Sequence, residues 1–116
     1  MTTLRNSVRL IGRVGQTPEI KNLENGRKVA NLSIATNDVY FNKQGEKVTQ
    51  TYWHNLVAWG KTAEVIENYI DKGKEIAIEG KLVNRTYDAQ DGTKRYVTEI
   101  LVNEVLMLGN KNQNAV

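Results

Sequence analysis

Large aromatic side chains recur through the middle of this chain, with basic side chains between them. The aromatics are Tyr40, Phe41, Tyr52, Trp53, Trp59, Tyr87 and Tyr96. The basic residues among and around them are Lys43, Lys61, Lys72, Lys74, Arg85 and Arg95. Aromatic rings on strand faces can stack on unpaired nucleobases, and the cations can neutralise the phosphates between those bases. The same rings could instead fill a core, so the direction in which each ring points decides between the two interpretations.

The segment from 51 to 59 separates its side chains sharply if it forms a β-strand. Alternation then puts one set on one face, namely Trp53, Asn55, Val57 and Trp59. The opposite face carries Tyr52, His54, Leu56 and Ala58. Two tryptophans with an asparagine make an unusual core wall. The first face therefore predicts a stacking platform, on which Asn55 can hydrogen-bond a base edge or a phosphate.

The composition excludes several classes of protein. The 116 residues suffice for one domain with a real core, and the absence of cysteine excludes disulfides, thiolate metal sites and cysteine nucleophiles. A single histidine argues against a zinc site, and we expect no metal and no cofactor. No signal peptide or membrane span is recognisable, so we expect a cytoplasmic protein. The formal charge of +3 and the pI of about 9.2 are compatible with a polyanionic partner.

The hydrophobic pattern predicts five strands, at residues 8–14, 28–37, 51–59, 75–87 and 95–108. Between the third and fourth strands, helical spacing predicts a helix over 61–72, capped by Thr62 at its start and by Gly73 at its end. Gly80 predicts a bulge within the fourth strand. Polar stretches after residue 38 and around Asp91-Gly92 predict two long hairpin arms that project from the body.

Five strands with one helix between the third and the fourth are typical of the OB-fold, a mainly β Greek-key barrel that binds oligonucleotides or oligosaccharides. We expect this domain over residues 1–109 and a disordered C-terminal end over 110–116.

Several short motifs, in order along the chain, resemble the bacterial single-stranded DNA-binding protein family. They are residues 6–16, Pro18-Glu19, 29–31, 35–37, Trp53-His54, Trp59-Gly60-Lys61, 69–73 and 78–82, and the resemblance covers residues 4–109. It implies homotetrameric OB-folds that wrap single strands with little sequence preference during DNA replication, repair and recombination. It further implies a bacterial cytoplasmic location associated with the nucleoid.

The resemblance also assigns roles to particular residues. It implies stacking by Tyr40, Trp53, Trp59 and Tyr87, and phosphate contacts from Lys61, Lys72 and Arg85, with Lys43, Lys47, Lys94 and Arg95 as further basic residues on the arms. Tyrosine replaces the family's usual tryptophan at 40 and 87, and Trp59 replaces a common phenylalanine. Stacking tolerates these changes because a base needs only a π-face. The first strand is implied in subunit contacts, and the last is apolar on both faces, which suits burial in an oligomer.

Family members usually continue into a flexible linker and an acidic tip that recruits replication and repair proteins. This sequence ends at Asn114-Ala115-Val116 without either feature, as a trimmed chain or a short variant would. We therefore regard tail-dependent partners as doubtful. An alternative function remains open at this point, that of an OB-fold protein-interaction subunit in a primosome-like complex.

We expect no enzyme activity. Gly60-Lys61-Thr62 lies between a strand and a helix, as in a phosphate-binding P-loop, but Asn55 stands where that motif needs a glycine. His54 points away from the two tryptophans, which favours a structural role. No acidic residue has a pairing that demands acid-base chemistry.

Overall fold

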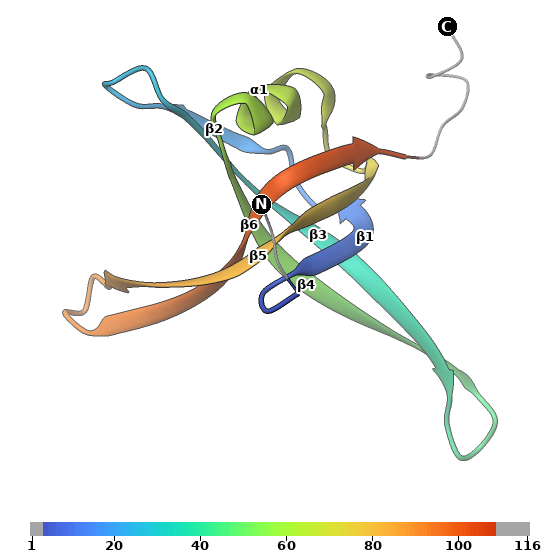
Figure 1. Cartoon of the computed structure of the whole chain (residues 1–116). Coiled ribbons are helices and arrows are strands. Elements are labelled where there is room, and N and C mark those ends of the chain that lie inside the picture. Colours follow the sequence, from blue (N-terminus) through green and yellow to red (C-terminus); the bar gives the residue numbers. More distant parts are fainter. Residues whose placement is uncertain (1–3, 109–116) are drawn as a thin grey trace, which may run out of the picture.

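A strongly curved β-sheet closes on itself in this protein, and one helix covers an end of it (Figure 1). The computed structural model describes residues 4–108. Its strands are β1 (Val8–Val14), β2 (Glu19–Asn22), β3 (Lys28–Phe41), β4 (Lys47–Trp59), β5 (Glu75–Asp88) and β6 (Lys94–Met107). The helix α1 (Gly60–Tyr69) lies between β4 and β5. The expected fold class, a mainly β OB-fold with one helix, is confirmed. The predicted C-terminal segment 110–116 lies outside the described residues.

The barrel consists of the five predicted strands, in the spatial order β1, β5, β6, β4 and β3. It closes where β1 pairs with β3, at Arg13 with Ala35 and Val14 with Ile34. The short β2 was not predicted as a strand. It pairs only with β3, outside the closed ring, and its mixed sequence has no strong strand signal.

The bulge predicted at Gly80 is confirmed. Gly80 pairs with Val102 while Glu79 pairs with Glu104, so Asn103 is an extra residue on β6. A Cβ at Gly80 would lie 2.2 Å from the carbonyl oxygen of Leu101, so only glycine fits this close approach. The extra residue also reverses the parity of β6, because Val102 points into the barrel and Glu104 points out.

The core follows the alternation of the strands. Its buried side chains on strands are Val14, Ala30, Leu32, Ile34, Leu56, Ala58, Ile76, Ile78, Ile100 and Val102. Ala63 and Ile66 of α1, with Ile70 just beyond it, close this core from one end. Leu82 continues the inward parity of β5 but is 48% exposed, because β5 has by then left the barrel for an arm.

The helix is shorter than predicted and is displaced toward the N-terminus. It starts at Gly60 directly after β4, so Thr62 lies inside it and makes no cap; Trp59 is the N-cap residue, without a side-chain hydrogen bond. The helix ends at Tyr69 because Ile70 already has extended backbone. Gly73 therefore is not the helix cap. Its φ of 87° serves a turn in which Lys74 N–H donates to the carbonyl of Asp71 at 3.2 Å.

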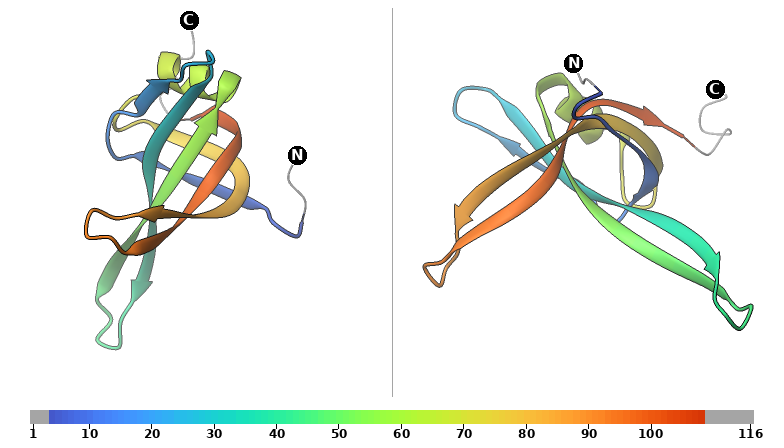
Figure 2. Two further views of the ribbon diagram at one scale, coloured as in Figure 1. Left: turned by 90° about the vertical axis from the view of Figure 1, so that its left-hand side faces the viewer. Right: turned by 60° about the horizontal axis from the view of Figure 1, so that its bottom comes forward.

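Both predicted arms are present and project from the barrel in different directions (Figure 2). The β3–β4 arm is an unbroken ladder from Val29 with Trp59 to Phe41 with Lys47, so β3 and β4 are longer than predicted. Its tip is closed by Asn42, whose Oδ1 accepts the N–H groups of Gln44 and Glu46 at 2.9 Å each. Residues 38–41 and 47–50 were predicted as part of the arm but not of its strands, whereas ladder hydrogen bonds hold them in β3 and β4.

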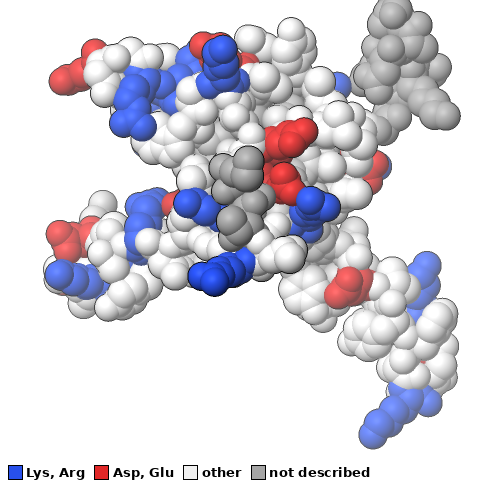
Figure 3. Space-filling view, in the orientation of Figure 1, with Lys and Arg blue, Asp and Glu red and all other residues white. Residues whose placement is uncertain are grey.

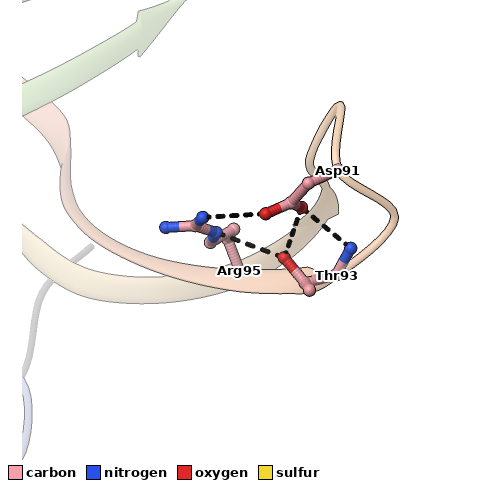
Figure 4. A network of polar contacts seen from close by, with 3 residues as sticks. All are labelled: Asp91, Thr93 and Arg95. Carbon is pink, nitrogen blue, oxygen red and sulfur yellow. Dashed lines mark hydrogen bonds and ion pairs between the residues drawn. The ribbon is translucent and has the colours of Figure 1, made fainter.

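A small polar network closes the tip of the β5–β6 arm (Figure 4). The Asp91 carboxylate accepts the hydroxyl of Thr93 at 2.6 Å and its N–H at 3.0 Å. These hydrogen bonds, led by the hydroxyl, lower the pKa of Asp91 below its ordinary value. Arg95 donates to the second carboxylate oxygen at 3.3 Å, so Asp91 already partly compensates the positive charge of Arg95.

Candidate nucleic-acid interface

The two faces of β4 differ as the alternation predicted. Leu56 and Ala58 are 1% and 0% exposed in the core, whereas Trp53 and Trp59 are 61% and 39% exposed on the other side. We call that other side the outer face. Direct cross-strand partners share a face, so Ser33 lies beside Asn55, and Val29 beside Trp59. The predicted stacking platform is therefore open to a ligand.

Two adjoining hollows lie on the outer face, of about 330 and 440 Å³. Asn31, Arg85 and Glu99 line both of them, so together they form one continuous groove. Asn55 lines the smaller hollow and Trp59 the larger one. Val57, which also shares this face, is 8% exposed and lines the larger hollow. The groove thus presents amide, guanidinium and carboxylate groups beside Trp59.

Trp53 is seated against backbone. A Cβ built on Gly15 would lie 2.4 Å from Cζ3 of this indole, so the ring occupies the space that a side chain at Gly15 would fill. The N–H of Gly15 donates to the carbonyl of Ser33 at 3.0 Å, which fixes this backbone beside β3. Gly15 is a site residue that sequence reasoning missed, since only the tertiary structure brings the end of β1 to Trp53.

Arg85 and Glu99 form an ion pair across β5 and β6 inside the groove. The Arg85 Nε donates to Glu99 Oε1 at 2.9 Å, and Nη2 lies 3.5 Å from Oε2. The Glu99 side chain is 9% exposed, whereas the Arg85 side chain is 57% exposed. Glu99 raises the pKa of the Arg85 guanidinium, first by hydrogen bonding and then by charge. Glu99 was not predicted, although its parity with Val97 and Leu101 was a signal for its place on this face.

Tyr87 also lies on the outer face, as its parity predicted. The guanidinium carbon of Arg85 is 5.9 Å from the centre of the Tyr87 ring, so these two predicted site residues are in contact. Both belong to β5, on the far side of the groove from β4. Asn55, Trp59 and Arg85 therefore line one groove, and Trp53 and Tyr87 lie on the same outer face without lining it.

Tyr40 is not brought to this face. It pairs with Val48, and four pairs further along the ladder Thr36 pairs with Tyr52, so Tyr40 and Tyr52 share the side opposite Trp53. Phe41 has the parity of Trp53 and is 69% exposed on the arm. Tyr40 itself is 49% exposed, so it is accessible to a ligand only from the other side of the β3–β4 arm.

The predicted basic contacts Lys61 and Lys72 are exposed at the edges of this region. Lys61 lies in the first turn of α1, two residues after Trp59. Lys72 follows Asp71, whose carboxylate accepts the hydroxyl of Thr17 at 3.2 Å. Thr17 lines the smaller hollow, so this turn borders the groove. Further basic side chains lie along both arms (Figure 3).

The geometry of the described residues does not support a catalytic-base role for His54 or a P-loop at Lys61. His54 is half-buried on the face of β4 opposite the tryptophans, where its Nε2 is 2.9 Å from the hydroxyl of Thr36. Helix α1 follows β4 without an intervening residue, so no glycine-rich loop is available to enclose a phosphate as in a P-loop. Across residues 4–108, no three acidic, histidine or cysteine side chains gather as a metal site. No helix in that range is long and apolar enough to cross a membrane.

Comparison with known proteins identifies one family over nearly the whole chain. Residues 5–108 match the Single-strand binding protein family. This chain belongs to that family. The resemblance inferred from the motifs is therefore confirmed.

Named members of the single-strand binding family are similar to the chain. The single-stranded DNA-binding protein of Neisseria meningitidis serogroup A is 39% identical over 110 residues, which are 95% of this chain and 63% of that protein. Single-stranded DNA-binding protein 1 of Chlorobaculum tepidum is 39% identical over 108 residues, 92% of this chain and 67% of that protein. The chain thus spans less than two thirds of the Neisseria relative.

Two solved structures of single-strand binding proteins share the fold. One is the Plasmodium falciparum SSB in complex with ssDNA, with a TM-score of 0.83 and 31% identity over 94% of this chain and 98% of that one. The other is a deletion mutant of the single-stranded DNA binding protein from Thermus aquaticus, with a TM-score of 0.78, 24% identity and coverage of 92% of this chain and 52% of that chain. The second shows the fold alone.

Proposed function

We propose that this chain binds single-stranded DNA without catalysis and with little sequence preference, and that it protects such strands during replication, repair and recombination. The observation that carries the proposal is the placement of Trp53 and Trp59 on one accessible face, with Arg85 across a groove from Trp59 and in contact with Tyr87. The ssDNA complex of the Plasmodium relative supports the same ligand.

The spacing of the two tryptophans fits an extended single strand of DNA. They are six residues apart on β4, which corresponds to about 20 Å. This is several times the rise of about 3.4 Å per stacked nucleotide, so each ring meets a different nucleotide. Stacking accepts any base, and cations such as Arg85 contact phosphates, which carry no sequence information. A duplex hides its base faces and cannot use these rings.

A fluorescence titration tests the proposal, because Trp53 and Trp59 are the only tryptophans in the chain. Oligo-dT is expected to quench the indole emission strongly, and duplex DNA to quench it far less. Equal binding of duplex and single strand would contradict the proposal. Binding of oligo-dT that is shown independently and leaves the emission unchanged would remove both tryptophans from the site.

The Arg85–Glu99 pair makes a prediction about charge in the groove. Replacing Arg85 with alanine removes a phosphate contact and leaves the Glu99 carboxylate uncovered where phosphates pass. We expect Arg85→Ala to weaken oligo-dT binding at least tenfold and to reduce the salt dependence by about 0.7 on a log-log plot, the value for one contact on a single strand.

Neutralising the carboxylate should partly reverse this loss. The double variant Arg85→Ala/Glu99→Gln is expected to bind more tightly than Arg85→Ala, because the repulsive charge is gone while the shape is kept. Anisotropy of labelled oligo-dT at several salt concentrations measures both effects. A double variant that binds no better than Arg85→Ala would show that Glu99 does not face the phosphates.

We further propose that the chain assembles as a homotetramer. An apolar patch on the outside of β1, β5 and β6 supports this, since Ile11 and Leu106 are 59% and 61% exposed around a hollow of about 580 Å³. Arg9 and Glu79, paired at 2.7 Å, border the patch with opposite charges and suit contact with a second copy.

Replacing Ile11 with glutamate is expected to reduce the assembled species, because the change puts a charge into the contact. Light scattering at micromolar concentration should report about four times the 13.1 kDa chain mass for the unaltered protein and less for Ile11→Glu. A mass of one chain for the unaltered protein would contradict the tetramer.

The alternative function, an interaction subunit of a primosome-like complex, is not favoured, because the matched relatives are named for binding single-stranded DNA. The proposed ligand also leads us to propose a cytoplasmic location at the nucleoid.

A further inference from the structure

Trp59 is covered on part of its ring by an arginine that comes from a different hairpin. The guanidinium carbon of Arg27 lies 4.6 Å from the centre of the indole, well within the range of a cation–π contact. Arg27 ends the turn between β2 and β3, immediately before Lys28 opens β3. Its parity is that of Val29, the direct cross-strand neighbour of Trp59, so its side chain starts from the outer face.

The backbone holds Arg27 in place before any ligand arrives. Its carbonyl accepts the N–H of Leu23 at 2.7 Å, and its own N–H donates to Oδ1 of Asn25 at 3.1 Å. Gly26, with a φ of 83°, makes the turn that permits this closure. The contact with Trp59 therefore comes from an anchored residue, which lowers the ordering cost of binding through it.

Arg27 lies outside the groove that Trp59 lines. Trp59 lines the larger hollow together with Val57 and Arg85, whereas Arg27 lines neither hollow. A base entering the groove can thus stack on Trp59 while Arg27 remains against the indole. The planar guanidinium suits this position, because it stacks on the ring and still points N–H groups outward along its edge.

No carboxylate within residues 4–108 compensates the positive charge of Arg27, so this charge is available to a ligand. Its neighbour Lys28 is paired with Glu67, and Lys21 on the same face is paired with Glu19 at 3.6 Å. Within residues 4–108, Arg27 has no carboxylate partner. Its guanidinium offers five N–H donors, of which the π contact uses none in a conventional hydrogen bond.

We propose that Arg27 is a further DNA-binding residue with two tasks: it supports the indole of Trp59 from outside the groove, and it donates to a phosphate beside the base that stacks on Trp59. The inference rests on the proposed binding of single-stranded DNA and adds a specific contact to it. It also places the β2–β3 turn, which carried no predicted site residue, on the path of the strand.

The test uses the Trp53→Phe chain, in which Trp59 is the sole tryptophan and a ring remains at position 53. Three variants are built on it: Arg27→Gln removes the charge, Arg27→Lys keeps the charge without the planar group, and Arg5→Gln makes the same charge change outside both hollows. Anisotropy of labelled oligo-dT gives affinity and salt dependence, the emission of Trp59 reports its surroundings, and thermal unfolding checks the fold.

We expect Arg27→Gln to weaken binding about fivefold to tenfold and to reduce the log-log salt slope by about 0.7. Arg27→Lys should keep the parent's salt slope yet bind about threefold more weakly, and both changes at Arg27 should alter the emission of Trp59 in the absence of DNA. Arg5→Gln should match the parent in each measurement.

Three results would overturn the inference. If Arg27→Gln matched Arg5→Gln in affinity and slope, Arg27 would take no part in binding. If both variants at Arg27 bound weakly with an unchanged slope, Arg27 would make no phosphate contact. If the unaltered chain failed to bind oligo-dT, the proposed function would fall first and this inference with it.

Discussion

Replacing Trp53 and Trp59 together with alanine is expected to weaken binding to oligo-dT by roughly 2–6 kcal/mol. Each base stacked on an aromatic ring contributes roughly 1–3 kcal/mol. The two rings are about 20 Å apart along β4, so their contributions should add. Both side chains are well exposed, at 61% and 39%, so the fold should tolerate their loss.

The measurement is anisotropy of labelled oligo-dT, which does not depend on protein fluorescence. Tyr69→Ala provides a matched control, because Tyr69 is an aromatic residue that is 59% exposed on α1 and lines neither hollow. It should bind as the unaltered chain does. If the double variant lost no more affinity than Tyr69→Ala, stacking on the outer face would be refuted as the main source of binding.

Gly80→Ala is expected to destabilise the barrel by about 1–3 kcal/mol or more, the usual cost of forcing a group into a packed interior. The new Cβ would lie 2.2 Å from the carbonyl oxygen of Leu101 and 2.9 Å from its carbonyl carbon. Leu101 cannot withdraw easily, since it belongs to β6, which pairs with both β5 and β4. The strain therefore falls on the β5–β6 ladder of the barrel.

Urea unfolding, followed by circular dichroism, measures this loss. Lys81→Ala is the control, since it changes the next residue of β5 at an exposed position and should shift the free energy of unfolding by less than about 0.5 kcal/mol. Equal stability of the two variants would show that the backbone near Leu101 moves to accommodate the new Cβ without loss of stability.

Local sequence patterns were enough to predict the strand faces. The alternation around Trp53 separated core from outer face correctly, and the same reasoning placed Arg85 and Tyr87 on the outside of β5. Pattern reasoning was weaker at boundaries. Polar residues made the predicted ranges of β3 and β4 too short, and Gly73 was assigned to the helix end although it belongs to a separate turn.

The tertiary structure alone decided which residues from distant strands meet around the groove. Gly15 is 38 positions from Trp53, whose ring lies against it. Glu99 is 40 positions from Trp59, with which it lines the larger hollow, and Arg27 is 32 positions from the same tryptophan. It also decided that Tyr40 faces away from Trp53. By itself, the sequence determined the fold class, the family and the platform face of β4, because strand alternation and short motifs depend on neighbouring residues. Register and barrel closure depend on hydrogen bonds between strands far apart in the chain, so the partners across the groove became visible only once those strands were in place.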